Sequence, residues 1–488
     1  MSDRRQIQSN AISGAIQAII AGAALFLIYR TVFTHEGASG VGIWAVVASI
    51  GAIGRIADAG INAALTRELA AIGHDSKRAR LISATLVFVA SAIALLLIAG
   101  YGGGRILLGH IFGGHILKQA LELLPWILVA TWTQCLSGVF AATLDGFNRI
   151  DQRNIWFSGA IVAQSIAILV LMPMFGLVAI GYSLAGVGLL QAVAGAWLVH
   201  RQVALRIRDF RFRSLHALKP LYKVGLGLQG AAVLSFFFDP LARILIAQAA
   251  GPAIAGYFDT AGRIVHQARQ VVHQFVHGIV PSMVRSTAQL QRDQGMRWFQ
   301  VTQDWTLWLG SGVTAGMVTL APSFSFVLLG TVHPPFVAIF AFVAVAWLLN
   351  HVALASYFRL YAEGRTRTIM TSHLVMVLSL VAGFMARPDA AGLLGAYFIG
   401  LWAGSIVLLF AGGTRQATSG MKFIGLTGTG SWLLPLGVFA TTPTTSWTVL
   451  SIGMAVVVGI GFIWSAPRMW ATWIAANPTD SNARGGEN

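Results

Sequence analysis

The chain has 488 residues, of which 56% are hydrophobic and only 10% are charged. This composition excludes the soluble globular classes, in which about a quarter of the residues are charged. The net charge of +16 would suggest a nucleic-acid partner in a soluble protein. In a membrane protein, cytoplasmic loops carry the same excess of lysine and arginine, so we expect a membrane protein with no nucleic-acid partner.

Apolar runs recur along the whole chain, and about 20 such residues suffice to cross the hydrocarbon core of a bilayer. A transmembrane β-barrel would show alternating segments of about 10 residues instead. The expected fold class is therefore an all-α polytopic membrane protein with fourteen helices. In chain order they are Ile12–Phe33, Val41–Ala64, Leu81–Tyr101, Leu121–Leu144, Ile155–Phe175, Leu177–Val199, Val224–Ala250, Ala255–Val284, Trp305–Leu329, Pro335–Phe358, Thr368–Ala386, Ala391–Ala411, Phe423–Ala440 and Trp447–Trp464.

The distribution of charge predicts the topology. With the N-terminus in the cytoplasm, most of the 33 Lys and Arg residues fall in loops on that side, and both termini are cytoplasmic. The first run, Ile12–Phe33, is too long for the apolar region of a signal peptide, so we interpret it as a membrane helix. Insertion into a bacterial inner membrane is the expected localisation. The most basic loop, Arg201–Lys223, is interpreted as a topology anchor, with binding of anionic lipid headgroups as the alternative.

An internal repeat relates the first six predicted helices to the next six at an offset of 214 residues. Gly42 then matches Gly256, and Phe147 matches Tyr361. Six helices in each half give both halves the same orientation, which is a parallel repeat. The predicted domains are an N-terminal six-helix bundle at 1–205, a C-terminal six-helix bundle at 206–412, two appended transmembrane helices at 413–466 and a disordered cytoplasmic tail at 467–488.

One predicted helix, Ala255–Val284, is unusually polar for a membrane span. At 3.6 residues per turn its polar residues form one stripe, called the polar stripe here. The polar stripe consists of Asp259, Arg263, His266, Gln270, His273 and His277. Ionisable residues at membrane depth normally face a water-filled cavity or a partner. The pattern therefore predicts a net-cationic surface inside the protein.

Arg269 lies on the same helix and, like the three histidines, has no acidic residue one turn away. A cationic surface without compensating acids favours an anion, and arginine makes paired contacts with phosphate oxygens. His266, His273 and His277 would add groups that titrate near neutral pH. The alternative is that the histidines only form hydrogen bonds with neighbouring helices. Cavity lining explains their spacing without a metal ion, so we expect no metal site.

Three acid–arginine pairs also lie within predicted helices. Each pair is three or four residues apart and can neutralise itself along one helix face, which is the structural alternative to a role in binding. The pairs are Arg55 with Asp58, Asp239 with Arg243, and Asp259 with Arg263.

Several catalytic motifs are missing from the sequence. No nucleotide-binding G-x-x-x-x-G-K-[ST] loop, C-x-x-C or H-E-x-x-H motif occurs. The predicted loops are too short to contain a catalytic domain. We therefore expect a secondary transporter without a cofactor and not an enzyme, driven by a coupling ion that the sequence leaves open between proton and sodium.

Two short patterns resemble a known family. Gly42-Ile43-Trp44 followed by Asp58-Ala59-Gly60 and Arg67 is similar to the second helix of polysaccharide flippases. Gly256-Tyr257-Phe258, Ala261-Gly262-Arg263 and Pro281 resemble its counterpart in the second half, and the basic turn Asn148–Arg153 also fits. These are the O-antigen (Wzx-type) flippases of the multidrug/oligosaccharidyl-lipid/polysaccharide (MOP) exporter superfamily.

The resemblance implies a V-shaped pair of six-helix bundles that uses alternating access. It implies translocation of an undecaprenyl-diphosphate-linked oligosaccharide from the cytoplasmic to the periplasmic leaflet, with other polysaccharide assembly proteins as candidate partners. The expected binding residues are Arg55, Arg243, Arg263, Arg269, His266, His273 and His277. Asp58, Asp239 and Asp259 would orient the arginines or take part in coupling. The alternatives are a multidrug or cation antiporter of the same superfamily and, from another class, a membrane glycosyltransferase or ligase.

Overall fold

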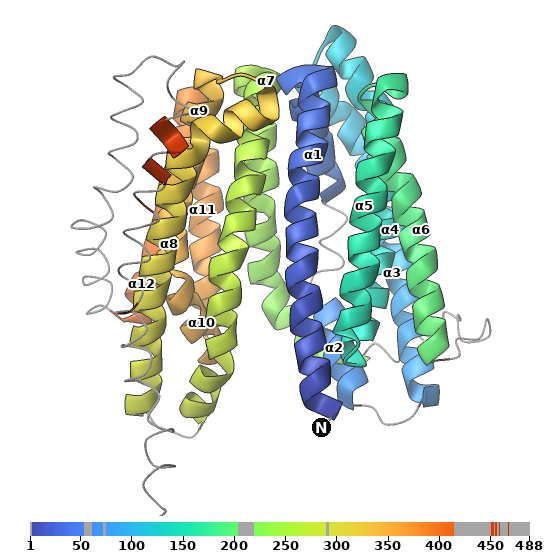
Figure 1. The fold of residues 1–488 in the computed structure, drawn as a ribbon, viewed down its shortest axis with the longest axis vertical. Helices are drawn as coiled ribbons and strands as arrows, with labels where there is room; N and C mark the ends of the chain where they lie inside the picture. The colour runs from blue at the N-terminus through green and yellow to red at the C-terminus, as the bar shows by residue number, and fades with distance from the viewer. Residues whose placement is uncertain are drawn as a thin grey trace, which may run out of the picture. The chain divides into compact units, whose positions relative to one another are not determined.

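A computed structural model describes residues 2–52, 61–71, 75–203, 219–288 and 292–413, with single positions among 450–467. Every regular element in these ranges is an α-helix (Figure 1). The helices are α1 (Ser2–Ala52), α2 (Ile61–Ala71), α3 (Asp75–Ile111), α4 (Gly114–Gly146), α5 (Ile150–Phe175), α6 (Val178–Gln202), α7 (Lys219–Ala288), α8 (Arg292–Leu329), α9 (Pro334–Val352), α10 (Leu354–Ala362), α11 (Thr366–Ala386) and α12 (Ala390–Gly412).

The described helices confirm the all-α, multi-pass fold class. Ten segments of the described residues are long and apolar enough to cross a membrane. Two of them, Ile12–Ala52 and Phe236–Gln270, each contain an internal break and so account for two predicted spans. The predicted helix Phe423–Ala440 lies outside the described part of the chain. Of Trp447–Trp464, only a few positions, such as 450–452, are described, and these are helical.

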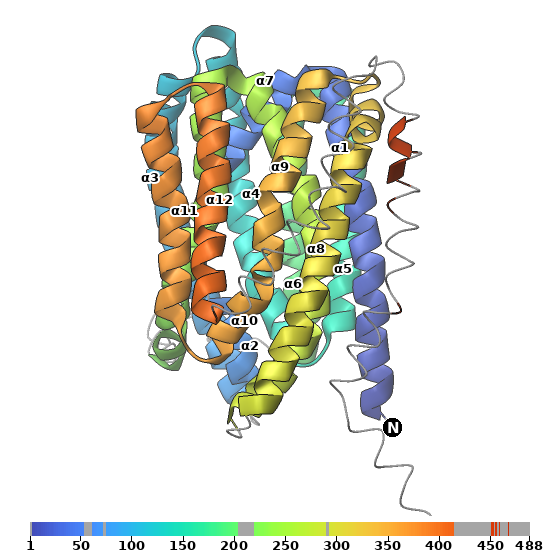
Figure 2. The same cartoon turned by 90° about the vertical axis from the view of Figure 1, so that its left-hand side faces the viewer.

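The chain divides into two compact units, Met1–Gly256 and Tyr257–Asn488. In the first unit α4 packs against α6, α3 and α1, and α5 packs against both α1 and α6 (Figure 1). In the second unit α11 and α12 lie side by side, and α9 packs against α8 and α12 (Figure 2). The predicted bundle boundary at 205/206 falls within 204–218, outside the described residues, and stays a prediction.

The breaks in α1 and α7 confirm the internal repeat at their position. Gly37 in α1 has φ 66° and ψ −170°, and Gly251 in α7 has φ 81° and ψ 170°. Only glycine adopts this backbone region without strain, which explains the residue type at both elbows. The two glycines are 214 residues apart, which is the offset expected from the sequence.

The backbones beside the two elbows also pack against each other reciprocally within the first unit. A methyl group at Gly42 would overlap the carbonyl oxygen of Pro252, and one at Gly256 would overlap that of Ala38. Pro252 and Ala38 are themselves related by the offset of 214. Two glycines without side chains thus allow a close crossing of backbones, as small residues do in membrane proteins generally.

Replacement of Gly42 by alanine is expected to destabilise the protein by about 1–3 kcal/mol, the usual cost of forcing extra volume into a packed site. The thermal midpoint of the purified protein in detergent measures the effect. Gly22→Ala is the matched control, because Gly22 lies on the same helix and a methyl group there meets no atom within 4 Å. Equal midpoints for the two variants would show that the crossing is looser than described.

The turns after α4 and α10 show where the repeat shifts register. Arg149 N–H donates to Leu144 O at 2.8 Å, and Arg365 N–H donates to Leu360 O at 2.9 Å. Both turns contain a residue with positive φ, Asn148 in the first. Equivalent atoms are 216 residues apart here, so the second half has gained two residues since the elbow. By this turn Phe147 therefore corresponds to Glu363 and not to Tyr361.

Candidate functional site

The ion pair on α7 is the first element of the site. Asp259 accepts a hydrogen bond from Arg263 Nε at 2.9 Å, as expected for residues one turn apart. Asp259 is fully buried, whereas the Arg263 side chain is 35% exposed. A carboxylate is thus held in the interior by a guanidinium group that reaches outward. This contact confirms the predicted pairing and leaves the guanidinium charge at the edge of the polar stripe.

The next residues of α7 lie against one aromatic ring. The ring of His266 is 4.6 Å from that of Trp347 between centroids, and Arg269 lies over the same ring with its Cζ 5.2 Å from the centroid. The face of an indole attracts cations. A guanidinium group stacked on such a face keeps its charge and presents its N–H groups at its edge, where an anion can accept them.

Trp347 is itself held in place by a chain of contacts within the second unit. Its Nε1 donates to Tyr397 Oη at 2.8 Å, and the Tyr397 ring packs edge-on against Phe258 at 4.9 Å. All three side chains are buried. Because the indole N–H is satisfied and the ring is packed, Trp347 forms a rigid platform for His266 and Arg269.

Two further histidines complete a cluster around Arg269. The positive charge of Arg269 acts on His351 at the end of α9 and on His373 of α11, and His266 also acts on His351. His351 is 1% exposed, and among the described residues neither of its ring nitrogens has a hydrogen-bond partner. A buried polar group left in this way costs about 1–3 kcal/mol, which calls for a functional explanation.

His351 lies beside a break in the helix. The predicted helix Pro335–Phe358 is interrupted at Ala353, where α9 ends and α10 begins. Gln303 of α8 donates through Nε2 to the carbonyl of Val352 at 2.9 Å, next to the break. Interrupted helices at membrane depth are tolerated where the backbone is paired or lines a cavity, and they often mark transporter sites.

The sequence model of a family described as "Polysaccharide biosynthesis protein" matches residues 7–287, more than half of the chain. The chain belongs to the polysaccharide biosynthesis protein family. No curated protein matched its sequence.

Solved structures show the fold of this polysaccharide biosynthesis protein. A lipid II flippase, MurJ, in an inward closed conformation has a TM-score of 0.71 at 13% identity, over 94% of this chain and 99% of that chain. An inward-facing multidrug resistance MATE family transporter of the MOP superfamily has a TM-score of 0.68 at 15% identity, over 83% and 99%. A MOP superfamily transporter from Pyrococcus furiosus, whose binding pocket is described as having reverse polarity, has a TM-score of 0.51 at 14% identity, over 83% of this chain and 96% of that chain. The chain therefore has the fold of these transporters, as the resemblance predicted.

The polysaccharide biosynthesis protein brings together only part of the predicted site. Arg263, His266, Arg269 and His273 all lie in the second unit, where His273 packs on Phe358 at 5.3 Å between centroids. Asp239 and Arg243 lie partly buried on α7 in the first unit. Arg55 and Asp58 lie outside the described ranges. The side chain of His277 is likewise not described, so the roles of these residues stay predictions.

Sequence reasoning missed Trp347, His351 and His373. The two histidines carry the signal that identified the polar stripe, a polar side chain within a predicted span, but each stands alone on its helix. Nothing in the sequence marked Trp347 as a site residue, because a single aromatic residue in an apolar run usually packs in the protein core. Only the packing of α9 against α7 gives it a role.

If His351 serves binding, its replacement by leucine should raise the stability of the fold and lower the transport rate. Removing two buried nitrogens that lack partners is expected to stabilise the fold by about 1–3 kcal/mol while transport falls. Thermal midpoint and transport rate are measured on the same preparation. His333→Leu is the control, because His333 is exposed. A lower midpoint would show that His351 serves packing instead.

Proposed function

We propose that this protein is a flippase for a lipid-linked oligosaccharide. In this proposal it moves an undecaprenyl-diphosphate-linked repeat unit of O-antigen or another polysaccharide from the cytoplasmic to the periplasmic leaflet of a bacterial inner membrane, by alternating access. The observation that carries the proposal is the Arg269 cluster at membrane depth, in which Arg269 and His266 lie against the rigid Trp347 ring and His351 lies within reach of the Arg269 charge.

The chemistry of the cluster favours a diphosphate. Arg269 places a planar, permanently charged guanidinium group over the Trp347 ring. Arg269 would donate to phosphate oxygens, and one ring N–H group each of His266 and His351 would donate further hydrogen bonds. Membership in the polysaccharide biosynthesis family and the fold shared with a lipid II flippase support the same substrate class.

A multidrug antiporter is the second candidate, because a MATE transporter shares the fold. Such a transporter binds cations and would need an acidic cavity. In the second unit, the one acid on the described polar stripe, Asp259, is buried and paired with Arg263. This arrangement favours an anionic substrate over a cationic drug.

Depletion of the protein in its host tests the proposal. Right-side-out and inverted membrane vesicles are treated with impermeant periodate, and the oxidised lipid-linked glycan is quantified in each. We expect depletion to confine full-length glycan to the cytoplasmic face. An unchanged distribution would reject the flippase. Shortened or missing glycan would indicate a glycosyltransferase, and increased sensitivity to cationic dyes alone would indicate an antiporter.

A further inference from the structure

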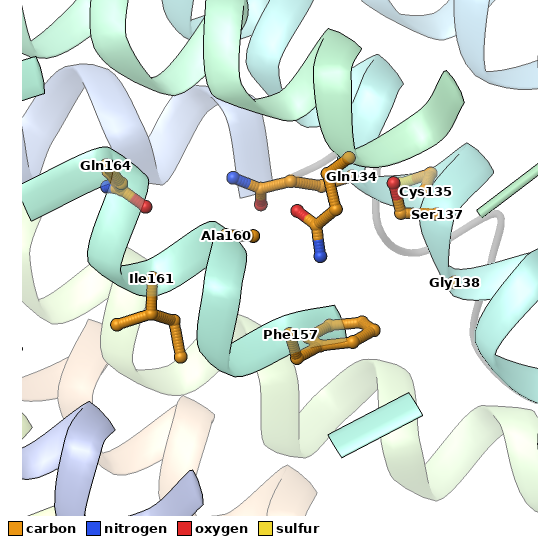
Figure 3. Close-up of a pocket in the computed structure, with 9 residues that line it drawn as sticks. Gln134, Cys135, Ser137, Gly138, Phe157, Ala160, Ile161 and Gln164 are labelled. Atoms are coloured by element: carbon orange, nitrogen blue, oxygen red, sulfur yellow. The ribbon is translucent and has the colours of Figure 1, made fainter. Parts of the chain in front are cut away.

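A second polar site lies in the first unit, on helices that carry none of the residues of the Arg269 cluster. A cavity of about 300 Å³ opens between α4, α5 and α6 (Figure 3). Its polar lining comes from Gln134 and Ser137 of α4, Gln164 of α5 and Gln191 of α6, and Phe157 forms part of the wall. Figure 3 shows the amides of Gln134 and Gln164 within this space and the Phe157 ring at its edge. None of the described residues that line the cavity is charged.

Glycines on α6 let this helix approach α4 and α5 closely near the cavity. Gly181, Gly188 and Gly195 recur every seventh residue, so they lie close to one face of the helix. A methyl group at Gly188 would overlap Thr133 of α4, and one at Gly195 would lie 2.5 Å from the indole ring of Trp156. The helices therefore approach closely at these two levels. Gln191 lies between them, at the level where the cavity is open.

The lining chemistry indicates what the cavity holds. An amide in hydrocarbon without partners costs several kcal/mol, so Gln164 and Gln191 on the walls of one membrane-embedded space imply a polar occupant. Each amide offers two donors and an acceptor oxygen, which match hydroxyl groups that both donate and accept. The absence of charge from the lining disfavours a phosphate or a metal cation. The volume is at the lower end of the range for small-molecule sites.

We propose that this cavity binds a neutral, hydroxyl-rich sugar unit. The inference rests on the proposed function, because it assigns to this cavity the glycan part of the same lipid-linked substrate. Gln164 and Gln191 hydrogen-bond the sugar hydroxyls, and Phe157 packs against its C–H face. The two units then recognise different chemistry, with sugar hydroxyls bound in the first and phosphate oxygens in the second.

A labelling experiment on the full-length protein in lipid nanodiscs tests this assignment. Cys135 is the only cysteine and lines the cavity, so Cys135→Ser with Ala160→Cys places one reporter thiol on the α5 wall. The probes are the neutral oligosaccharide released by mild acid from the host's lipid-linked intermediate, and farnesyl diphosphate. We expect saturating oligosaccharide to slow alkylation of the thiol at least fivefold, and farnesyl diphosphate to leave the rate unchanged.

Paired variants identify the groups responsible. Gln164→Leu with Gln191→Leu should weaken the oligosaccharide's protection of the thiol about tenfold or more, since two hydrogen bonds are lost. Gln202→Leu is the control, because Gln202 is an exposed amide at the end of α6. If the double leucine variant does not fold, Gln191→Asn shortens the amide without removing it and should weaken protection in the same direction. Unchanged protection in the folded variants, or no protection in the parent, would overturn the proposal.

The two probes separate this inference from the proposed function. Binding of farnesyl diphosphate is measured by quenching of the intrinsic tryptophan fluorescence in the same nanodiscs. Glutamine-dependent protection by the sugar without farnesyl diphosphate binding would leave the cavity assignment intact and reject the headgroup site. Farnesyl diphosphate binding without protection by the sugar would reject the cavity assignment alone. A cavity that holds only water gives this second result.

Discussion

Replacement of Arg269 by glutamine is expected to slow translocation of the lipid-linked oligosaccharide about 30- to 1000-fold. Arg269 lies on the Trp347 ring and carries the charge that reaches His351 and His373. Removing one partner of a charge-assisted contact costs about 2–4 kcal/mol, which corresponds to that range of rates. Glutamine keeps much of the length of the side chain and can still hydrogen-bond, so the loss reports on charge.

The measurement is the translocation rate in proteoliposomes, normalised to folded protein. Arg269→Lys should retain an intermediate rate, because an ammonium group keeps the charge and loses the planar pair of donors. Arg365→Gln is the control. Arg365 lies on the turn after α10, its side chain is 49% exposed, and it donates to Ala411 O. Full activity of Arg269→Gln at normal abundance would remove Arg269 from the substrate site.

The second large effect is on stability and concerns the Asp259–Arg263 pair. Arg263→Gln leaves a fully buried carboxylate without its ion pair, and the expected loss is about 3 kcal/mol, at the low end for buried pairs because Arg263 is 35% exposed. Asp259→Asn should cost less, because the released guanidinium group can reach water. The double variant Asp259→Asn with Arg263→Gln should recover most of the loss, since no buried charge remains.

Thermal midpoints of the three variants in detergent form a double-mutant cycle. Arg387→Gln is the matched control, because it breaks an ion pair of similar length, 3.0 Å to Asp389, whose side chains are 69% and 53% exposed. An exposed pair contributes about 0–1 kcal/mol. Additive effects of Asp259→Asn and Arg263→Gln would contradict a direct interaction in the folded protein.

The helices were predictable because hydropathy over about 20 residues is set by the bilayer itself. Their ends were less so. The α3 helix runs from Asp75 to Ile111, beyond the predicted Leu81–Tyr101, because polar flanking turns continue a helix outside the hydrocarbon without changing the hydropathy signal. The break at Ala353 was not predictable, since alanine is a strong helix former and neither glycine nor proline marks the position.

The candidate site was predictable to the extent that charge at membrane depth is rare. That rule identified Asp259, Arg263, His266 and Arg269 on one helix. It could not identify Trp347, because the value of an aromatic ring to a cation depends on which helix packs beside it. The amide-lined cavity was missed for a related reason, since Gln134, Gln164 and Gln191 lie on three separate helices, and the sequence does not show that they meet.

The interruption between α9 and α10 makes the two halves of the chain chemically unequal. Its counterpart in the first half, α4, continues through the corresponding stretch without interruption. Gene duplication would have supplied two identical halves. The helix α4 is continuous in the first half, whereas its counterpart in the second half is interrupted beside the arginines of α7. A tandem chimera made from two copies of the first half would therefore lack both this interruption and the Arg269–Trp347 arrangement beside it.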